Sequence, residues 1–144
     1  MNAPGSNSSP GTAPAEHGVG ARVIAAIATP AGEGALGIVR LSGPDVPAIA
    51  ARFLRAPLSP RQACLGLIHD EGEPIERAMS VFFPGPESYT GENLLELTAH
   101  GSPYLLSRIL ELAVRAGARL AEPGEFTRRA YLNGRMDLAQ AEAV

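Results

Sequence analysis

The chain has 144 residues, 45% of them hydrophobic, which is enough for one ordinary domain with a buried core. Its formal net charge of −3 argues against a stand-alone nucleic-acid-binding protein, which usually carries a basic face. All twelve basic residues are Arg, so no lysine is present to form a Schiff base or a P-loop. A single cysteine, Cys64, excludes an intrachain disulfide and a cysteine-based zinc site.

The first half of the chain predicts mainly strands. Residues 1–21 are rich in Gly, Ser, Pro and Ala and predict a disordered tail, not a signal peptide. Short apolar runs predict strands over residues 22–28 and 36–41, joined by a Pro/Gly loop. Apolar residues at helical spacing then predict a helix over residues 45–55.

The second half predicts a hairpin, a strand and helices. Apolar runs over residues 62–69 and 75–83 flank a polar turn, which indicates a β-hairpin, and a further strand is predicted over residues 93–99. Ser102 as N-cap and Pro103 at the first helical position predict a helix over residues 102–116. A short extended piece leads to another helix over residues 126–132.

The last residues predict the start of one more helix. Asp137 and Gln140 have the spacing of a capping box, and the residues between Leu138 and Ala143 favour a helix. Isolated helices shorter than about 12 residues are marginal in water. We therefore expect residues 136–144 to be the start of a helical domain that the chain does not complete.

A glycine-rich loop over residues 32–37 matches G-x-G-x-x-G literally. A dinucleotide site of this kind also needs a helix that opens at the loop and binds the pyrophosphate. Here the loop runs into the strand-like segment Ile38–Leu41 and then into a Ser-Gly-Pro breaker. The pattern therefore favours a loop that joins two strands over a dinucleotide site.

Two charged residues stand inside predicted strands. Arg40 has two interpretations: the solvated face of a half-exposed strand, or a cation aimed at a carboxylate or ring carbonyl in a pocket. Glu96 alternates with Leu95 and Leu97, so it is either a solvated strand residue or a pocket carboxylate. A carboxylate has two adjacent acceptors, which suit the amino and ring N–H edge of a pterin or guanine.

The remaining polar residues predict structural roles on periodicity alone. His100 follows a strand and favours a structural hydrogen bond, and three scattered histidines predict no metal site. Arg128 and Arg129 fit a solvated helix face, with Glu125 near the helix start. Arg135 follows an Asn-Gly turn, from which it is able to reach an anion.

Four spaced motifs occur together and in order: IATPAG with GIVRLSG (27–43), FPGPESYTGE (83–92), LEL with His-Gly (95–101), and PGEFT with NGRMDLAQAEA (123–143). Over residues 22–144 the chain resembles the amino-terminal domain of the MnmE (TrmE) family of tRNA-modification GTPases. The resemblance implies an α+β fold, a mixed sheet with a few helices, similar to the tetrahydrofolate-binding domain of glycine-cleavage T-protein. Residues 22–135 would form the folate-binding and dimerisation domain.

The resemblance also implies a ligand, partners and a compartment. The family binds 5-formyltetrahydrofolate, a one-carbon folate, and the positions that match its contacts are Arg40, Glu96 and Arg135. Family members often have Lys at the last position, which keeps the charge but changes the hydrogen-bond geometry. The implied setting is a cytoplasmic homodimer that acts with the flavoprotein MnmG (GidA) on the wobble uridine, U34, of tRNA, with no membrane.

The family's GTPase domain carries a P-loop, and a chain without lysine has none. GTP, Mg²⁺ and K⁺ would therefore belong to the missing GTPase domain, and we expect this chain to be inactive as an enzyme alone. Two other hypotheses stay open: a purely structural dimerisation domain without a folate pocket, and an independent tRNA-binding protein, which would bind tightly and with strong salt dependence.

Overall fold

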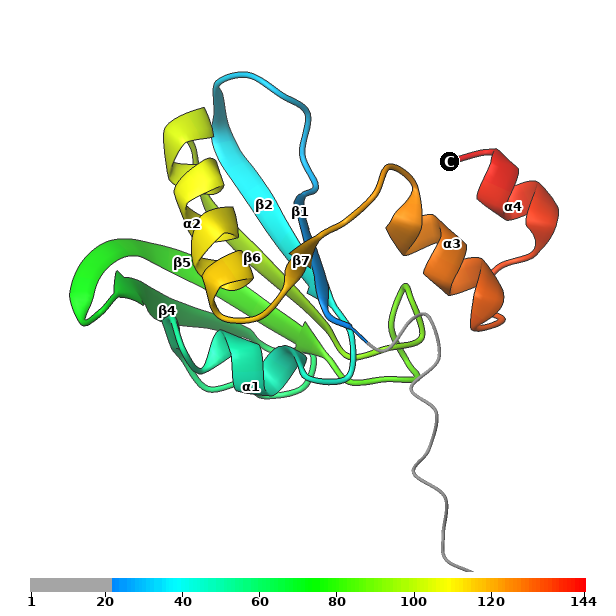
Figure 1. Cartoon of the computed structure of the whole chain (residues 1–144), viewed down its shortest axis with the longest axis horizontal. Coiled ribbons are helices and arrows are strands. Elements are labelled where there is room, and N and C mark those ends of the chain that lie inside the picture. Colours follow the sequence, from blue (N-terminus) through cyan, green and yellow to red (C-terminus); the bar gives the residue numbers. More distant parts are fainter. Residues whose placement is uncertain (1–21) are drawn as a thin grey trace, which may run out of the picture.

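The computed structural model describes residues 22–144, so the tail predicted over residues 1–21 lies outside the described residues. The strands are β1 (Ile24–Ile27), β2 (Gly34–Ser42), β3 (Leu54–Arg55), β4 (Ala63–Asp70), β5 (Glu73–Phe83), β6 (Leu94–Gly101) and β7 (Arg119–Leu120). The helices are α1 (Val46–Ala50), α2 (Pro103–Arg115), α3 (Glu125–Leu132) and α4 (Leu138–Glu142). The strands form one sheet, with α1 and α2 packed on one face, and α3 and α4 lie to the side of the sheet, past β1 and β7 (Figure 1). The predicted α+β class is confirmed.

The sheet has the order β3-β4-β5-β6-β2-β1-β7. Its β1–β7 pair is parallel and the other neighbouring strands are antiparallel, so the sheet is mixed. The predicted hairpin is β4–β5, and its turn places Glu71 at φ 49° and Gly72 at φ 91°. Positive φ at both central residues is the geometry of a turn that matches the twist of paired strands.

The core lies between α2 and the sheet. Leu106, Ile109 and Ala113 of α2 are buried against the central strands, where Val39 and Leu97 are fully buried. Burying such side chains is the main favourable term in folding. The predicted start of α2 is confirmed, since the Ser102 hydroxyl accepts a hydrogen bond from the Leu105 amide at 3.5 Å.

The glycine-rich loop joins two strands, as predicted, because β2 begins at Gly34 and no helix opens there. Two glycines allow close packing around this loop. A Cβ at Gly37 would collide with the Leu106 side chain, and a Cβ at Gly101 would collide with the Gly34 backbone. These glycines therefore serve packing between β2, β6 and α2.

The helix predicted over residues 45–55 is shorter than predicted. α1 ends at Ala50, and Leu54 and Arg55 form β3, which pairs with β4. The apolar positions that suggested a longer helix are still buried, since Phe53 is 2% exposed. Backbone pairing with β4 replaces the last helical turn, and Pro57 follows closely, which disfavours helix before it.

The C-terminal helices differ in their environment. α3 buries Glu125, Arg129 and Ala130, whereas α4 buries none of its residues. α4 begins with the predicted capping box, in which the Asp137 carboxylate accepts from the Gln140 amide at 2.8 Å. Within residues 22–144 no helix is long and apolar enough to cross a membrane.

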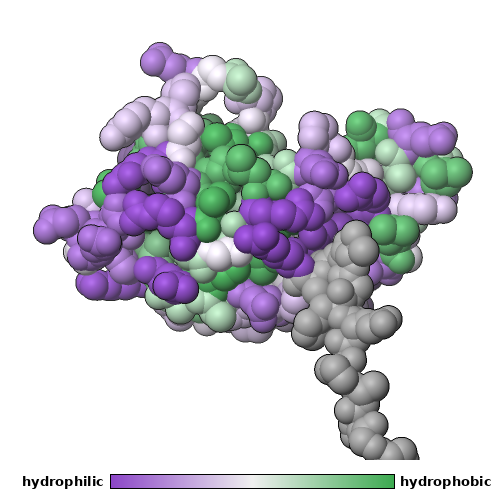
Figure 2. All heavy atoms as spheres, in the orientation of Figure 1, coloured by the Kyte–Doolittle hydropathy of each residue, from purple (hydrophilic) through white to green (hydrophobic). Residues whose placement is uncertain are grey.

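The face in Figure 2 has polar surface over the α2 and β4 side and again between β7 and α3, with apolar surface between them.

Candidate functional site

Arg40 and Glu96 are direct partners across the β2–β6 ladder. Both side chains lie on the sheet face opposite α2, because the residues that flank them, such as Val39 and Leu97, fill the core. The Arg40 Nε and Nη2 atoms donate to Glu96 Oε1 at 3.0 Å and 2.8 Å. The side chains keep 28% and 26% of their surface exposed, so this ion pair is accessible from solvent.

Two aromatic rings flank this ion pair. The Arg40 Cζ atom lies 5.7 Å from the centroid of Tyr89 and 5.9 Å from that of Phe126. These distances are within the range of cation–π attraction. The Tyr89 hydroxyl also hydrogen-bonds to Thr127 Oγ1 at 2.9 Å, which fixes the loop that carries Tyr89 against α3. Recognition of a flat ring is one use of such an arrangement, since it combines polar edges with aromatic faces.

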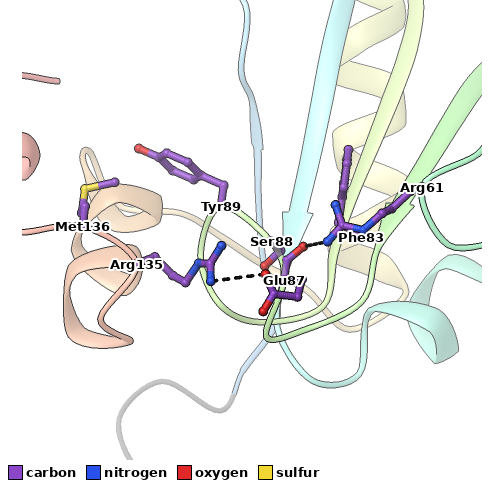
Figure 3. Close-up of a pocket in the computed structure, with 7 residues that line it drawn as sticks. All are labelled: Arg61, Phe83, Glu87, Ser88, Tyr89, Arg135 and Met136. Carbon is purple, nitrogen blue, oxygen red and sulfur yellow. Dashed lines mark hydrogen bonds and ion pairs between the residues drawn. The ribbon is translucent and has the colours of Figure 1, made fainter.

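Arg135 lies in a neighbouring pocket of about 390 Å³ rather than at the ion pair. Its Nη1 atom lies 3.6 Å from Glu87 Oε2. Tyr89 lines this pocket (Figure 3). Its ring also approaches Arg40, so Tyr89 borders both the pocket and the ion pair. The lining residues are Arg61, Phe83, Glu87, Ser88, Tyr89, Arg135 and Met136.

The structure therefore brings Arg40 and Glu96 into contact and places Arg135 beyond Tyr89. Sequence reasoning assigned no role to Tyr89, Phe126 or Arg61. The motif that contains Tyr89 was visible in the sequence, but a loop has no periodicity that indicates where its side chains lie.

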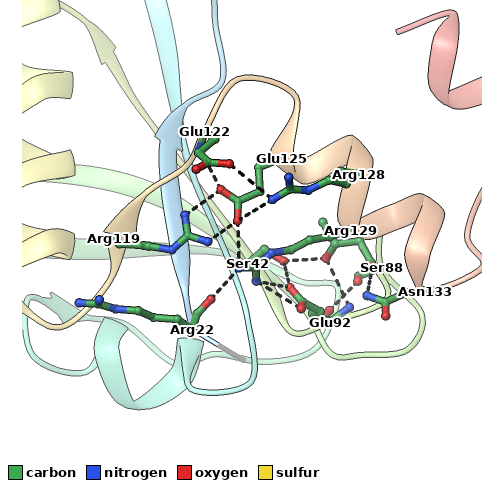
Figure 4. Close-up of polar contacts among 11 residues, drawn as sticks. Arg22, Ser42, Ser88, Glu92, Arg119, Glu122, Glu125, Arg128, Arg129 and Asn133 are labelled. Carbon is green, nitrogen blue, oxygen red and sulfur yellow. Dashed lines mark hydrogen bonds and ion pairs between the residues drawn. The ribbon is translucent and has the colours of Figure 1, made fainter. Parts of the chain in front are cut away.

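A network of buried charges lies next to the site (Figure 4). Arg129 is 4% exposed, so the prediction that it lies on a solvated helix face is wrong. Its guanidinium donates to Glu92 Oε2 at 3.0 Å, to Glu125 Oε1 at 3.3 Å and to the Arg22 carbonyl at 2.9 Å. A helix face that packs against the chain can bury a long cationic side chain when carboxylates satisfy its donors.

The same network holds the loop before β6. Glu92 Oε2 accepts from Ser42 Oγ at 2.7 Å, and the Ser42 and Thr90 hydroxyls hydrogen-bond at 2.7 Å. Asn133 Nδ2 donates to the Thr90 carbonyl at 2.7 Å. Both α3 and the end of β2 therefore anchor the loop that carries Tyr89.

The electrostatics of this network stabilise the ionised form of Glu125. Hydrogen bonds from the Arg119 guanidinium lower the pKa of Glu125 to about 2, although burial opposes the change. The Glu122 amide donates to the same carboxylate at 2.8 Å and also lowers this pKa. Hydrogen bonding to the ionised form is a recognised cause of such a shift. Glu125 is therefore an anion that accepts hydrogen bonds from two arginines, Arg119 and Arg129.

His100 has a structural contact, since its Nδ1 atom lies 2.7 Å from Glu76 Oε2. Within residues 22–144 no group of three or more His, Cys, Asp or Glu side chains has the arrangement of a metal site. The groups gathered around Tyr89 are hydrogen-bond donors, acceptors and aromatic rings. Such groups suit the binding of a flat polar ligand.

Comparisons with known proteins agree on one family. A family model described as "GTP-binding protein TrmE N-terminus" matches residues 23–135. Proteins named tRNA modification GTPase MnmE are 56% identical in Bordetella petrii, 53% in Aquifex aeolicus and 50% in Thermotoga maritima. Each match covers 84% of this chain, but only 28%, 28% and 27% of the respective relative. The chain thus spans just over a quarter of the length of these relatives.

Proposed function

Because the chain belongs to the TrmE amino-terminal family, we propose that it binds 5-formyltetrahydrofolate and dimerises as part of a GTPase that modifies tRNA. Residues 22–135 form the folate-binding and dimerisation domain, and residues 136–144 begin a helical domain. The name of these relatives, tRNA modification GTPase, supports the tRNA-modifying role. The cytoplasm is the compartment in which such an enzyme meets its tRNA.

The observation that carries the folate proposal is the Arg40–Glu96 pair beside two aromatic rings. A pterin ring presents N–H donors and a carbonyl acceptor on adjacent edges. Glu96 would accept from the N–H edge, while a guanidinium of Arg40 donates to a carbonyl or carboxylate group. Tyr89 and Phe126 offer aromatic surface to the flat ring.

The uncovered sheet face supports the dimerisation proposal. Leu65 and Met79 are direct partners on β4 and β5, on the same face as Glu96, and are 58% and 41% exposed. Leu36 at the start of β2 is 65% exposed. Apolar side chains grouped on a sheet face mark surfaces that bind other protein.

We assign the other parts of the full activity to the region of the relatives that this chain does not cover. GTP binding with Mg²⁺ and K⁺ requires a P-loop lysine, and this sequence has no lysine. Joint action with the flavoprotein MnmG on U34 of tRNA is likewise a property that we propose for the complete enzyme.

Titration calorimetry with 5-formyltetrahydrofolate tests the folate proposal. We expect saturable binding that weakens at least about tenfold in Glu96→Gln, since a lost charged hydrogen bond costs roughly 1.5–3 kcal/mol. Glu76→Gln is the matched control, because Glu76 is also a partly buried strand carboxylate in an ion pair. Dimers that show no binding of the ligand would instead support the purely structural hypothesis.

A further inference from the structure

The pocket beyond Tyr89 has two guanidinium groups on its wall, and only one of them belongs to the proposed folate contacts. We propose that Arg61, together with Arg135, binds a carboxylate of the glutamate tail of the folate ligand. This inference rests on the proposed function and extends it from the ring to the tail.

Arg61 is held in place from several sides. Its amide donates to the Phe82 carbonyl at 2.8 Å, and its guanidinium lies 5.8 Å from the centroid of the Phe83 ring. The guanidinium also donates to the Glu87 carbonyl. Contacts of this kind fix the direction of a long side chain before a ligand arrives, which lowers the entropic cost of binding.

The backbone of Arg61 is strained. Its φ of 59° lies in the left-handed region, which glycine adopts readily and arginine rarely does. Strain of this kind is retained where the surrounding structure imposes it and often marks a binding site. A glycine at position 61 would adopt this backbone conformation without strain. The presence of an arginine there indicates that its side chain has a role.

Arg135 faces the same pocket from the other wall. Arg135 follows the end of α3, and its amide donates to the Ala130 carbonyl in that helix at 2.8 Å. Glu87 lies between the two arginines (Figure 3). Its carboxylate is 70% exposed and lies 3.6 Å from Arg135, so this contact is weak enough for another carboxylate to displace it.

The position and chemistry of the pocket select the ligand group. Tyr89 borders both this pocket and Arg40, so a ring held at Arg40 and Glu96 would direct its tail past Tyr89. Planar guanidinium groups match carboxylates with paired hydrogen bonds. A folate tail ends in a glutamate with two carboxylates, which fits two arginines on opposite walls.

Calorimetry with two ligands tests the inference: 5-formyltetrahydrofolate and the carboxamide of 5-formyltetrahydropteroate, which lacks the glutamate and carries no carboxylate. We expect the unmodified chain to bind the carboxamide about tenfold more weakly, the loss expected for one charged hydrogen-bonded contact. Arg61→Gln should weaken folate binding by a similar factor and leave carboxamide binding unchanged. Glu87→Gln should strengthen folate binding, because it removes the competing carboxylate.

Two further variants separate binding from folding. Arg61→Gly relieves the strained backbone, so it should melt no lower than the unmodified chain and still lose the preference for the glutamate tail. Arg77→Gln, an exposed arginine on β5, should change neither affinity.

Equal affinities of the unmodified chain for both ligands, or an equal loss for both in Arg61→Gln, would overturn the tail contact while leaving the folate proposal intact. Binding of neither ligand would overturn the proposed function, and this inference with it.

Discussion

Two groups of arginines and carboxylates lie close together in this protein and differ in burial. Arg40 and Glu96 form a single pair that keeps about a quarter of its surface exposed. Arg129 and Glu125 have 5% and 1% of their side chains exposed, and they share hydrogen bonds with further residues and with the backbone. Burial with many partners indicates a structural role, whereas an accessible pair with few partners is available to a ligand.

The largest difference between these groups should appear on removal of Arg129. Arg129→Met leaves Glu92 and Glu125 without their shared cation, and breaking a buried pair costs about 3–5 kcal/mol. Urea denaturation at neutral pH measures this loss in the free energy of unfolding. Arg128→Met is the control on the same helix, and it should change stability by less than about 0.5 kcal/mol, because that side chain is 55% exposed.

The second-largest effect should come from acid, which lowers the free energy of unfolding when Glu125 is protonated. Glu125 has a pKa of about 2 when folded and an ordinary value of 4.5, so its stabilising contribution is complete above pH 4.5 and is lost as the pH falls through about 2. The shift corresponds to roughly 3 kcal/mol. Unfolding free energies between pH 6 and pH 2 measure it. Glu125→Gln should remove this part of the acid dependence, and an unchanged pH profile in that variant would contradict the assignment.

A smaller effect is expected at Gly91, which lies in the loop between Tyr89 and Glu92. Gly91 has φ of 78°, and a Cβ there would lie 2.9 Å from Asn133 Cβ and 3.3 Å from Arg135 Cγ. Gly72 has a similar φ of 91° but open space around it. Gly91→Ala should therefore lower the free energy of unfolding by about 2 kcal/mol and Gly72→Ala by about 1 kcal/mol. Both substitutions strain the backbone, but only the one at Gly91 also causes a steric collision. Equal losses in thermal unfolding would contradict close packing at Arg135.

The smallest stability change should come from the accessible pair. Arg40→Gln should cost less than about 1 kcal/mol, because partly exposed ion pairs contribute little. Its affinity for 5-formyltetrahydrofolate should nevertheless fall, as for Glu96→Gln. If chemical denaturation shows a loss as large as that of Arg129→Met, the pair is structural and the distinction between the two groups is wrong.

Local sequence patterns were sufficient for most of the fold. Alternation and apolar runs predicted the β4–β5 hairpin, and Ser102 with Pro103 predicted the start of α2. The end of α1 was wrong because pairing of Leu54 with Ile68 depends on a distant strand. Helical spacing of apolar residues indicates which face of a helix is buried, but it does not indicate which long polar side chains the fold also buries.

Arg129 shows that limit most clearly. Its neighbour Arg128 has the same chemistry one position away, yet one side chain is buried and the other is exposed. The difference depends on where Glu92 lies in space, which no local pattern reveals. The candidate site has the same character: the charges of Arg40 and Glu96 were visible in the sequence, but their pairing depends on the β2–β6 register.

That register has a consequence for how the protein folds. Arg40 and Glu96 are 56 residues apart in sequence, so they meet only after the β2–β6 ladder has formed. Local hairpins such as β4–β5 form within about 1–10 μs, whereas long-range pairings are slower because a long loop must close first. An early intermediate that contains only the hairpin would lack this ion pair. A ligand that requires both residues would then bind only chains in which β2 and β6 have already paired.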